Sequence, residues 1–300
     1  MNLPGPFLRT IEQTFGQRGR DFLQTLPDLV DEAARRWQLT DVQPVSNLSY
    51  NYVAFADRLG ESVVLKIGVP NRELLSEMTA LHLFDGRAAV RLLESDEERS
   101  MFLLERLKPG DMLTSVDDDS QATEIAADLM RLLWRTQISD ARLIQLSDWF
   151  TGFQKLRTRF DGGTGPFSDH LVSRAESIAR DFCAGQHIPA LIHGDLHHFN
   201  ILASRRGWLA IDPKGVLGPA GYEVGPFLIN PWVVSGLPAD APGLIADRIA
   251  VFAEHLEFER SYLRDWGLAH AVLSAWWSLD GDEDWRPALQ CAQMLASLQI

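Results

Sequence analysis

The chain has 300 residues, 46% of them hydrophobic and 23% charged, which is enough to bury a substantial core in one large domain or two lobes. Its formal net charge of −13 disfavours nucleic acid and anionic membranes as partners, because both are bound through positive patches, and it suits a cationic ligand. The two cysteines, Cys183 and Cys291, form no C-x-x-C pair, which argues against a zinc ribbon or a disulfide framework.

Residues 1–13 have no apolar signal core, and no apolar run has the roughly 18 residues of a membrane span, so we expect a cytoplasmic protein. The elements predicted in the first third of the chain are a helix over 7–37 that breaks near Pro27, two or three antiparallel strands over 41–68, a helix over 70–85, and a strand pair over 88–96 and 100–107. Runs of β-branched and aromatic residues indicate the strands. The second helix has Pro70 at its start and Gly86 at its end.

Helical patterns dominate the rest of the chain. The predicted elements are a turn over 108–113, helices over 119–138, 144–160 and 169–184, a short strand over 208–212, and mostly helix from about 223 to 300 around a loop at 237–243. We therefore expect an α+β protein with two lobes. Residues 1–107 would form a small strand-rich N-lobe, and residues 108–300 a larger helical C-lobe.

Residues 191–202, LIHGDLHHFNIL, concentrate polar groups that suit two kinds of chemistry. The first is a metal-hydrolase site formed by His193, Asp195, His197 and His198. The second is a catalytic loop for phosphoryl transfer, because Asp195 and Asn200 have the spacing D-x-x-x-x-N. Zinc and iron sites usually take ligands from further segments, and the remaining histidines form no second cluster, which disfavours the hydrolase.

Phosphoryl transfer also needs a cation that positions the phosphates and a carboxylate that holds this cation. Lys66, in the strand VVLKI, supplies the cation. The following helix offers Glu73 or Glu77 as its partner, and Glu77 is preferred because it lies about one turn before the apolar stripe of that helix.

The remaining parts of such a site are present in the same order. Asp195 would orient and finally deprotonate the acceptor hydroxyl. Asn200 and Asp212, which follows the strand WLAI, would hold Mg²⁺ through hard oxygen ligands. Each residue alone is a weak signal, but Lys66 before the loop and Asp212 twelve residues after Asn200 make the combination specific.

The segments HGDLHHFN and IDPKG resemble the catalytic and metal loops of the aminoglycoside phosphotransferases, which have a protein-kinase-like fold. Further segments resemble one branch, the aminoglycoside/hydroxyurea antibiotic resistance kinases, which include streptomycin 6-phosphotransferases. These segments are WQL (37–39), VVLKIGVP (63–70), EMTALHLFDG (77–86), RLLESD (91–96), LLERLKPG (103–110), GYEVGPFLINP (221–231) and AHAVLSAWWSLDGDED (269–284). The resemblance covers nearly the whole chain in order.

The resemblance implies further roles. His193 and Glu223 would brace the catalytic loop, and His197 would steady it or touch the acceptor. A hinge formed by Glu105, Arg106 and Leu107 would bind adenine through backbone groups. Lys214 would approach either phosphate or solvent.

The loop expected to cover the phosphates departs from the kinase pattern, because SNLSYN contains no glycine. Ser46, Asn47 and Ser49 could still donate from their side chains. One wall of the acceptor cleft would come from Trp277, Asp280 and Asp282, with Trp276, Glu283, Asp284 and Trp285 nearby. Flat aromatic faces beside carboxylates suit a polyhydroxylated cation.

The resemblance thus implies an ATP- and Mg²⁺-dependent O-phosphotransferase whose acceptor is an aminoglycoside such as streptomycin, or hydroxyurea. A choline-like or ketosamine-like acceptor would use the same fold and the same aspartate. A catalytically silent binding protein with a kinase fold is the third hypothesis, supported by the glycine-free loop alone. We expect no nucleic-acid or membrane partner.

Overall fold

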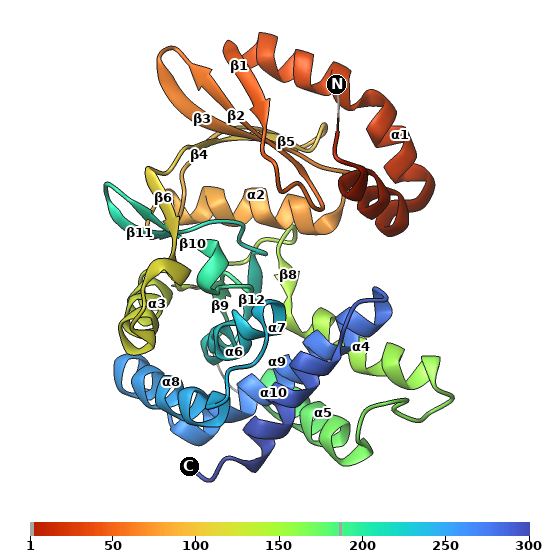
Figure 1. Ribbon diagram of the computed structural model, residues 1–300, viewed down its shortest axis with the longest axis vertical. Coiled ribbons are helices and arrows are strands. Elements are labelled where there is room, and N and C mark those ends of the chain that lie inside the picture. Colours follow the sequence, from red (N-terminus) through yellow and green to blue (C-terminus); the bar gives the residue numbers. More distant parts are fainter. Residues whose placement is uncertain (1–2, 186–187) are drawn as a thin grey trace.

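The computed structural model describes residues 3–185 and 188–300, which form a strand-rich lobe and a mostly helical lobe (Figure 1). The first lobe contains a five-stranded antiparallel sheet with the strand order β1-β2-β3-β5-β4. Its strands are β1 (Leu39–Pro44), β2 (Tyr52–Arg58), β3 (Glu61–Ile67), β4 (Leu92–Asp96) and β5 (Met101–Glu105). The α+β fold class predicted from the sequence is therefore confirmed. The boundary proposed at residues 107 and 108 lies between β5 and the next strand.

Two helices, α1 (Gly5–Trp37) and α2 (Arg72–Phe84), cover the two faces of this sheet (Figure 1). Side chains alternate between the faces of a strand, so Leu65 and Ile67 pack in the cluster beneath α1. Their neighbour Lys66 faces the other side, toward α2. The alternation of β3 thus determines where the only charged residue of its VVLKI run is placed.

The predicted break of the first helix near Pro27 is wrong. Pro27 lies inside α1, and the non-helical residue is Gly16, with φ +58°. Glycine adopts positive φ without steric cost, so the bend falls at this residue. Asn71 caps the start of α2, because its side chain accepts a hydrogen bond from the Leu74 amide at 2.9 Å.

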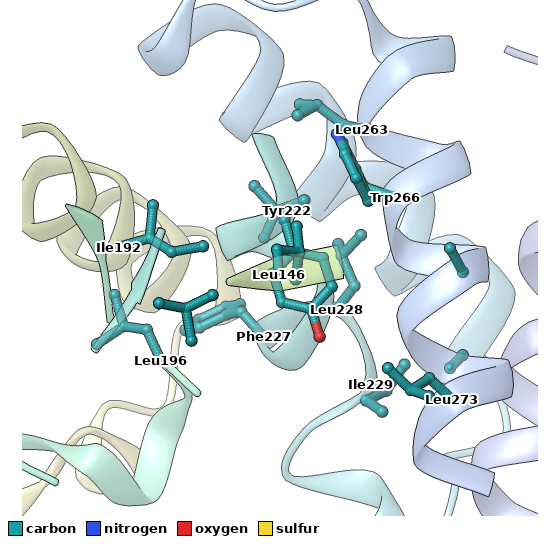
Figure 2. Packing of buried hydrophobic residues seen from close by; sticks show 14 of the residues in the cluster. Leu146, Ile192, Leu196, Tyr222, Phe227, Leu228, Ile229, Leu263, Trp266 and Leu273 are labelled. Atoms are coloured by element: carbon teal, nitrogen blue, oxygen red, sulfur yellow. The ribbon is translucent and has the colours of Figure 1, made fainter. Parts of the chain in front are cut away.

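The second lobe is built around α9 (Arg260–Asp280), which packs against most of its neighbours. The other helices of eight or more residues described here are α3 (Asp119–Leu133), α4 (Leu146–Arg159), α5 (Asp169–Ala184), α8 (Ala241–Leu256) and α10 (Arg286–Ser297). Shorter helices are α6 (Val224–Ile229), α7 (Trp232–Ser235) and the 3₁₀ turns η1 (Leu113–Ser115), η2 (His198–Asn200) and η3 (Ala220–Glu223). Figure 2 shows the core of this lobe, where Tyr222 and Trp266 pack among leucine and isoleucine side chains. The mostly helical region after about residue 223 is confirmed.

Short strands of the second lobe surround the polar loop. One small sheet has the order β11-β10-β6, and the other the order β7-β9-β12-β8. The strands are β6 (Pro109–Met112), β7 (Arg135–Thr136), β8 (Ile144–Gln145), β9 (Ala190–Ile192), β10 (Ile201–Ser204), β11 (Gly207–Ala210) and β12 (Val216–Gly218). The polar loop therefore leaves the end of β9 and returns through η2 into β10.

Three sequence predictions need correction at these short strands. The segment 108–113 is not only a turn, because β6 pairs with β10 within it. The helix predicted over 119–138 ends at Leu133 and is followed by β7, and the helix predicted from residue 144 begins at Leu146 after β8. Strands of two to four residues depend on the partner strand for their hydrogen bonds, so their own sequence shows no clear alternation.

The two lobes are joined by hydrogen bonds close to the polar loop. Ser76 on α2 donates its hydroxyl to the Gly215 carbonyl at 2.6 Å and accepts from the Ile144 amide at 3.2 Å. The Val90 amide donates to the Ala210 carbonyl at 2.9 Å. Helix α2 is thereby held against the segment that follows Asp212.

Across the described residues, no helix combines the length and hydropathy that crossing a membrane would require.

Candidate active site

Lys66 lies in an ion-pair network with two carboxylates. Its Nζ is 2.6 Å from Glu77 Oε1 and 3.3 Å from Asp212 Oδ1. Lys66 and Glu77 are buried, whereas the Asp212 side chain is half-exposed. Desolvation disfavours the charge on Lys66, but the two carboxylates outweigh it and raise the pKa of Lys66 above its ordinary value. Of the two glutamates considered from the sequence, the structure brings Glu77 to Lys66, while Glu73 lines an outer cavity.

His193 anchors the start of the polar loop through hydrogen bonds on both ring nitrogens. Its Nε2 donates to the Ile211 carbonyl at 2.8 Å, and its Nδ1 accepts from the Asp195 amide at 3.2 Å. Complete burial lowers the pKa of His193 to about 4, so the ring is neutral at pH 7, as this pattern requires. His193 thus links the backbone amide of Asp195 to the carbonyl of Ile211, the residue before Asp212.

Glu223 holds the same loop from below. Its carboxylate accepts the His193 amide at 2.6 Å and the Gly194 amide at 2.9 Å. Burial raises the pKa of Glu223 to about 7, against the lowering effect of these amides. Gly194 has φ +87°, and a side chain there would meet Val216 at 2.7 Å and Trp149 at 3.0 Å, so the loop needs glycine at this position.

Asp195 and Asn200 lie at opposite ends of this loop. The Asp195 side chain is 33% exposed, with Oδ1 3.5 Å from Nε2 of His197. The side-chain nitrogen Nδ2 of Asn200 donates to the backbone carbonyl of Asp195 at 2.9 Å. The side-chain oxygen of Asn200 is therefore left for another partner. His197 also accepts the Phe199 amide at 3.3 Å, so it lies within the loop and beside the carboxylate of Asp195.

Asn200 and Asp212 are adjacent across the small sheet. The Ile211 amide donates to the Asn200 carbonyl at 2.9 Å, which places Asp212 next to that residue. Asp212 has φ +57°, and partial desolvation of its half-exposed carboxyl group opposes ionisation. The ammonium groups of Lys66 and Lys214 nevertheless hold the pKa of Asp212 below its ordinary value. Two hard oxygen donors, an amide oxygen and a carboxylate, therefore lie together where a divalent cation could bind.

The histidines of the metal-hydrolase hypothesis do not converge. The Nε2 of His193 bonds the Ile211 carbonyl. The ring of His198 is buried and stacks on Phe227 with a centroid distance of 4.0 Å. Within residues 3–185 and 188–300, no group of three or more histidine, cysteine or acidic side chains is arranged to hold a metal ion. The geometry gives the hydrolase hypothesis no support.

A cavity of about 400 Å³ opens between the lobes beside Lys66 and Asp212. Its walls are largely apolar and include Val45, Leu48, Val53, Val64, Val90, Leu104, Leu202 and Ile211. Asn47 and Ser49, from the loop between β1 and β2, line it near Lys66, whereas Ser46 is exposed and is not among its lining residues. An apolar slot with polar groups at one end suits a flat base joined to phosphates.

The predicted hinge residues form the far end of this cavity. Glu105 uses its carboxylate locally, because it accepts the Arg91 amide at 2.8 Å and pairs with Arg206. The guanidinium of Arg106 lies 3.7 Å above the Phe55 ring. Leu107 lines the cavity, and among the described residues its peptide groups make no recorded hydrogen bond, which leaves them available to a base edge.

The residues predicted for the acceptor wall separate in the structure. Trp277 is 39% exposed and packs edge-on against Trp149 at 5.5 Å, and Trp149 covers Gly194. Asp280 instead pairs with Arg159 at 3.2 Å, and Asp282 is an exposed turn residue after α9. Among the described residues, no recorded contact brings either carboxylate to the polar loop. Trp276 is buried in the core.

Trp149 was not singled out from the sequence, although it contacts the loop at Gly194. Trp149 also packs against Tyr222 at 5.9 Å, in the core next to Glu223. In the sequence, a tryptophan on an amphipathic helix is typical of core packing. Only the docking of α4 against the loop shows that this side chain borders Gly194, the residue before Asp195.

Solved structures of kinases and phosphotransferases have the same fold as this chain. The crystal structure of aminoglycoside phosphotransferase APH(4)-Ia aligns with a TM-score of 0.61 and 14% identity over 92% of this chain and all of that chain. A choline/ethanolamine kinase family protein from Mesorhizobium loti aligns with a TM-score of 0.64 and 14% identity over 89% of this chain and 95% of that chain. The fold is that of the kinase-like phosphotransferases.

The chain belongs to the aminoglycoside/hydroxyurea antibiotic resistance kinase family, whose family model matches residues 36–281. It is 28% identical over 291 residues to streptomycin 6-kinase of Streptomyces glaucescens, covering 96% of this chain and 94% of that protein. It is 31% identical over 280 residues to hydroxyurea phosphotransferase of Kitasatospora aureofaciens, covering 89% and 77%. The predicted family is confirmed, and the protein is a small-molecule phosphotransferase.

Proposed function

We propose that this enzyme transfers the γ-phosphoryl group of ATP to a hydroxyl group of an aminoglycoside of the streptomycin class. The observation that carries the proposal is the meeting of Lys66, Glu77 and Asp212 with the Asp195–Asn200 loop at one end of a cavity of nucleotide size. The streptomycin kinases support the acceptor class, because they match nearly the full length of the chain. The formal net charge of −13 suits a cationic acceptor.

The proposal assigns a role to each polar group. Lys66, held by Glu77, would position the α- and β-phosphates, and the apolar slot that ends at Leu107 would bind the base. Asp195 would orient the acceptor hydroxyl and take its proton. The acceptor oxygen then forms a bond to Pγ while the bond from Pγ to the bridging oxygen breaks, and that electron pair leaves with ADP.

The donor set also fits a magnesium ion. The side-chain oxygen of Asn200 and the carboxylate of Asp212 are hard ligands, and the depressed pKa of Asp212 keeps its carboxylate ionised at neutral pH. When bound, Mg²⁺ supplies positive charge to the phosphate oxygens. His193 and Glu223 would fix the loop backbone through their hydrogen bonds. This would hold Asp195, Asn200 and Asp212 in their relative positions. We place the reaction in the cytoplasm, where ATP is available.

Release of ADP in the presence of candidate acceptors tests the proposal. The panel contains streptomycin, hydroxyurea, choline and a sugar alcohol, and mass spectrometry of the acceptor detects the added phosphoryl group. We expect streptomycin-dependent ADP release and a monophosphorylated product. Phosphorylation of hydroxyurea or choline alone would overturn the proposed acceptor class and keep the phosphotransferase.

A catalytically silent kinase-fold protein is the competing hypothesis, and one measurement separates it from the enzyme. The presence of Asp195 and the pairing of Lys66 with Glu77 and Asp212 support the enzyme. The hydrogen bond from Asn200 to the Asp195 carbonyl supports it as well. Thermal stabilisation by Mg·ATP without phosphorylation of any acceptor in the panel would favour the silent protein.

A further inference from the structure

Lys214 stands out among the cations around a second cavity, of about 530 Å³, which adjoins the nucleotide site at Lys66 and Asp212. Lys66 is paired with Glu77 and Asp212, and Arg72 is paired with Asp148 at 2.8 Å. Within residues 3–185 and 188–300, Lys214 has neither an ion pair nor a side-chain hydrogen bond. It is only partly exposed, so its charge has lost part of its hydration. The carboxylates of Asp195 and Glu73 outweigh this desolvation and raise the pKa of Lys214, although neither forms an ion pair with it.

The backbone of Lys214 is held against the catalytic loop and α2. Its amide donates to the His193 carbonyl at 2.7 Å. The next residue, Gly215, has φ +66°, and its carbonyl accepts the Ser76 hydroxyl at 2.6 Å. A side chain on Gly194 would come within 3.3 Å of the Lys214 Cβ, so the lysine side chain starts beside the residue that precedes Asp195.

This position lies on the side of the phosphates where transfer would occur. The cavity is bounded by Ser49 of the β1–β2 loop, by Lys66 and Asp212, and by Lys214. Lys66 already has two carboxylate partners, which leave it little net charge for the terminal phosphate. A second, unpaired ammonium group between Asp212 and the Asp195 loop is placed to meet that group.

The glycine-free loop at residues 46–51 further supports a role for Lys214 in binding the phosphates. Residues 46–51, SNLSYN, contain no glycine, so their backbone has less conformational freedom to direct several amides at the phosphates than a glycine-rich loop has. The loop between β1 and β2 then neutralises less of the negative charge of the triphosphate. A side-chain cation from below replaces part of this missing interaction.

We propose that Lys214 contacts the γ-phosphoryl group during transfer, whereas Lys66 holds the α- and β-phosphates. The inference rests on the proposed nucleotide-dependent transfer. As the acceptor oxygen bonds to Pγ and the bridging oxygen leaves with ADP, the ammonium group of Lys214 stabilises the charge on the remaining oxygens of Pγ and keeps its own proton.

Calorimetric titration with two nucleotides tests this inference without any acceptor. Mg·ADP and Mg·AMP-PNP differ by the terminal phosphoryl group, so a contact to that group affects only the second. We expect Lys214→Met to leave the Kd of Mg·ADP nearly unchanged and to weaken Mg·AMP-PNP by about 10-fold or more, the loss of one charge-assisted hydrogen bond. Lys66→Met should weaken both nucleotides.

Two controls make the result specific. Lys214→Arg keeps the charge and should retain most of the preference for AMP-PNP over ADP. The loss of this preference in Lys214→Met would then come from the missing charge and not from a folding defect. Lys155→Met removes an exposed lysine of α4 and should change neither affinity. Equal weakening of both nucleotides by Lys214→Met, or no weakening of AMP-PNP, would overturn the inference alone. A wild-type protein that binds neither nucleotide would overturn the proposed function and this inference together.

Discussion

The ammonium group of Lys66 lies 2.6 Å from the Glu77 carboxylate, and both side chains are buried. Removing one partner of a buried pair leaves an uncompensated charge, which costs about 3–5 kcal/mol. We expect Glu77→Gln to lower the free energy of unfolding by about 3 kcal/mol, the lower end of this range because Asp212 still pairs with Lys66. Urea denaturation measures this difference.

A double variant serves as the control for this pair. Lys66→Met combined with Glu77→Leu removes both charges, so it should recover most of the lost stability while still binding nucleotide poorly. A double variant as unstable as Glu77→Gln alone would show that the cost does not come from the unpaired charge.

Lys66, Glu77, Asp195, Asn200 and Asp212 could be picked out from the sequence because each occupies a position with a local marker. Lys66 interrupts an apolar strand, and Glu77 lies about one turn before the apolar stripe of the following helix. Asp195, Asn200 and Asp212 have the spacing of a catalytic loop and the strand after it. The alternation of β3 then necessarily turns Lys66 toward α2.

Features that depend on docking could not be predicted in the same way. The bend of α1 falls at Gly16, where φ is +58°, and Pro27 is accommodated within the helix. Trp149 borders the catalytic loop only because α4 packs there, and Asp280 turns to Arg159 rather than to the cleft. Charges and aromatic residues clustered in sequence do not reveal which direction they face.

Glu223 should make stability depend on pH. Its pKa is raised to about 7 in the folded protein from an ordinary value of 4.5, chiefly by burial. The folded state therefore binds this proton more tightly, and the stability that Glu223 contributes is present below pH 4.5 and is lost as pH rises to 7. The loss amounts to about 3 kcal/mol at 1.36 kcal/mol per pKa unit.

The comparison with Glu223→Gln isolates this effect, because glutamine does not titrate. The free energy of unfolding of the wild type, minus that of the variant, should fall as pH rises through this range. Other titrating groups, such as His193 and His270, are common to both proteins and cancel. A difference that stays constant with pH would show that Glu223 has an ordinary pKa.

Trp149 should act on the acceptor and not on the nucleotide. It covers Gly194, the residue before Asp195, and packs against the exposed Trp277. We expect Trp149→Ala to lower kcat/KM for the acceptor by about 10-fold or more through misplacement of the reacting groups, with the Kd of Mg·ATP unchanged. Trp285→Ala is the matched control, because Trp285 packs against Phe167. Equal losses in both variants would assign Trp149 a structural role only.

Asp212 should couple magnesium to nucleotide binding. Asp212→Asn removes the carboxylate that would bind the metal and leaves Lys66 paired with Glu77. We expect wild-type protein to bind ATP more tightly with Mg²⁺ than with EDTA, and the variant to lose this difference. An unchanged effect of Mg²⁺ in the variant would exclude Asp212 as its ligand.

Turnover by Asp195→Asn tests the central claim most directly. The measurement is acceptor-dependent ADP release by wild type and variant, alongside the Kd of Mg·ATP for each. The account predicts that kcat falls by about 10²–10⁴-fold, the contribution of a positioned general base, while nucleotide affinity is nearly unchanged. Near-normal turnover by the variant would contradict the account, because the carboxylate at the centre of the loop would then not take part in transfer.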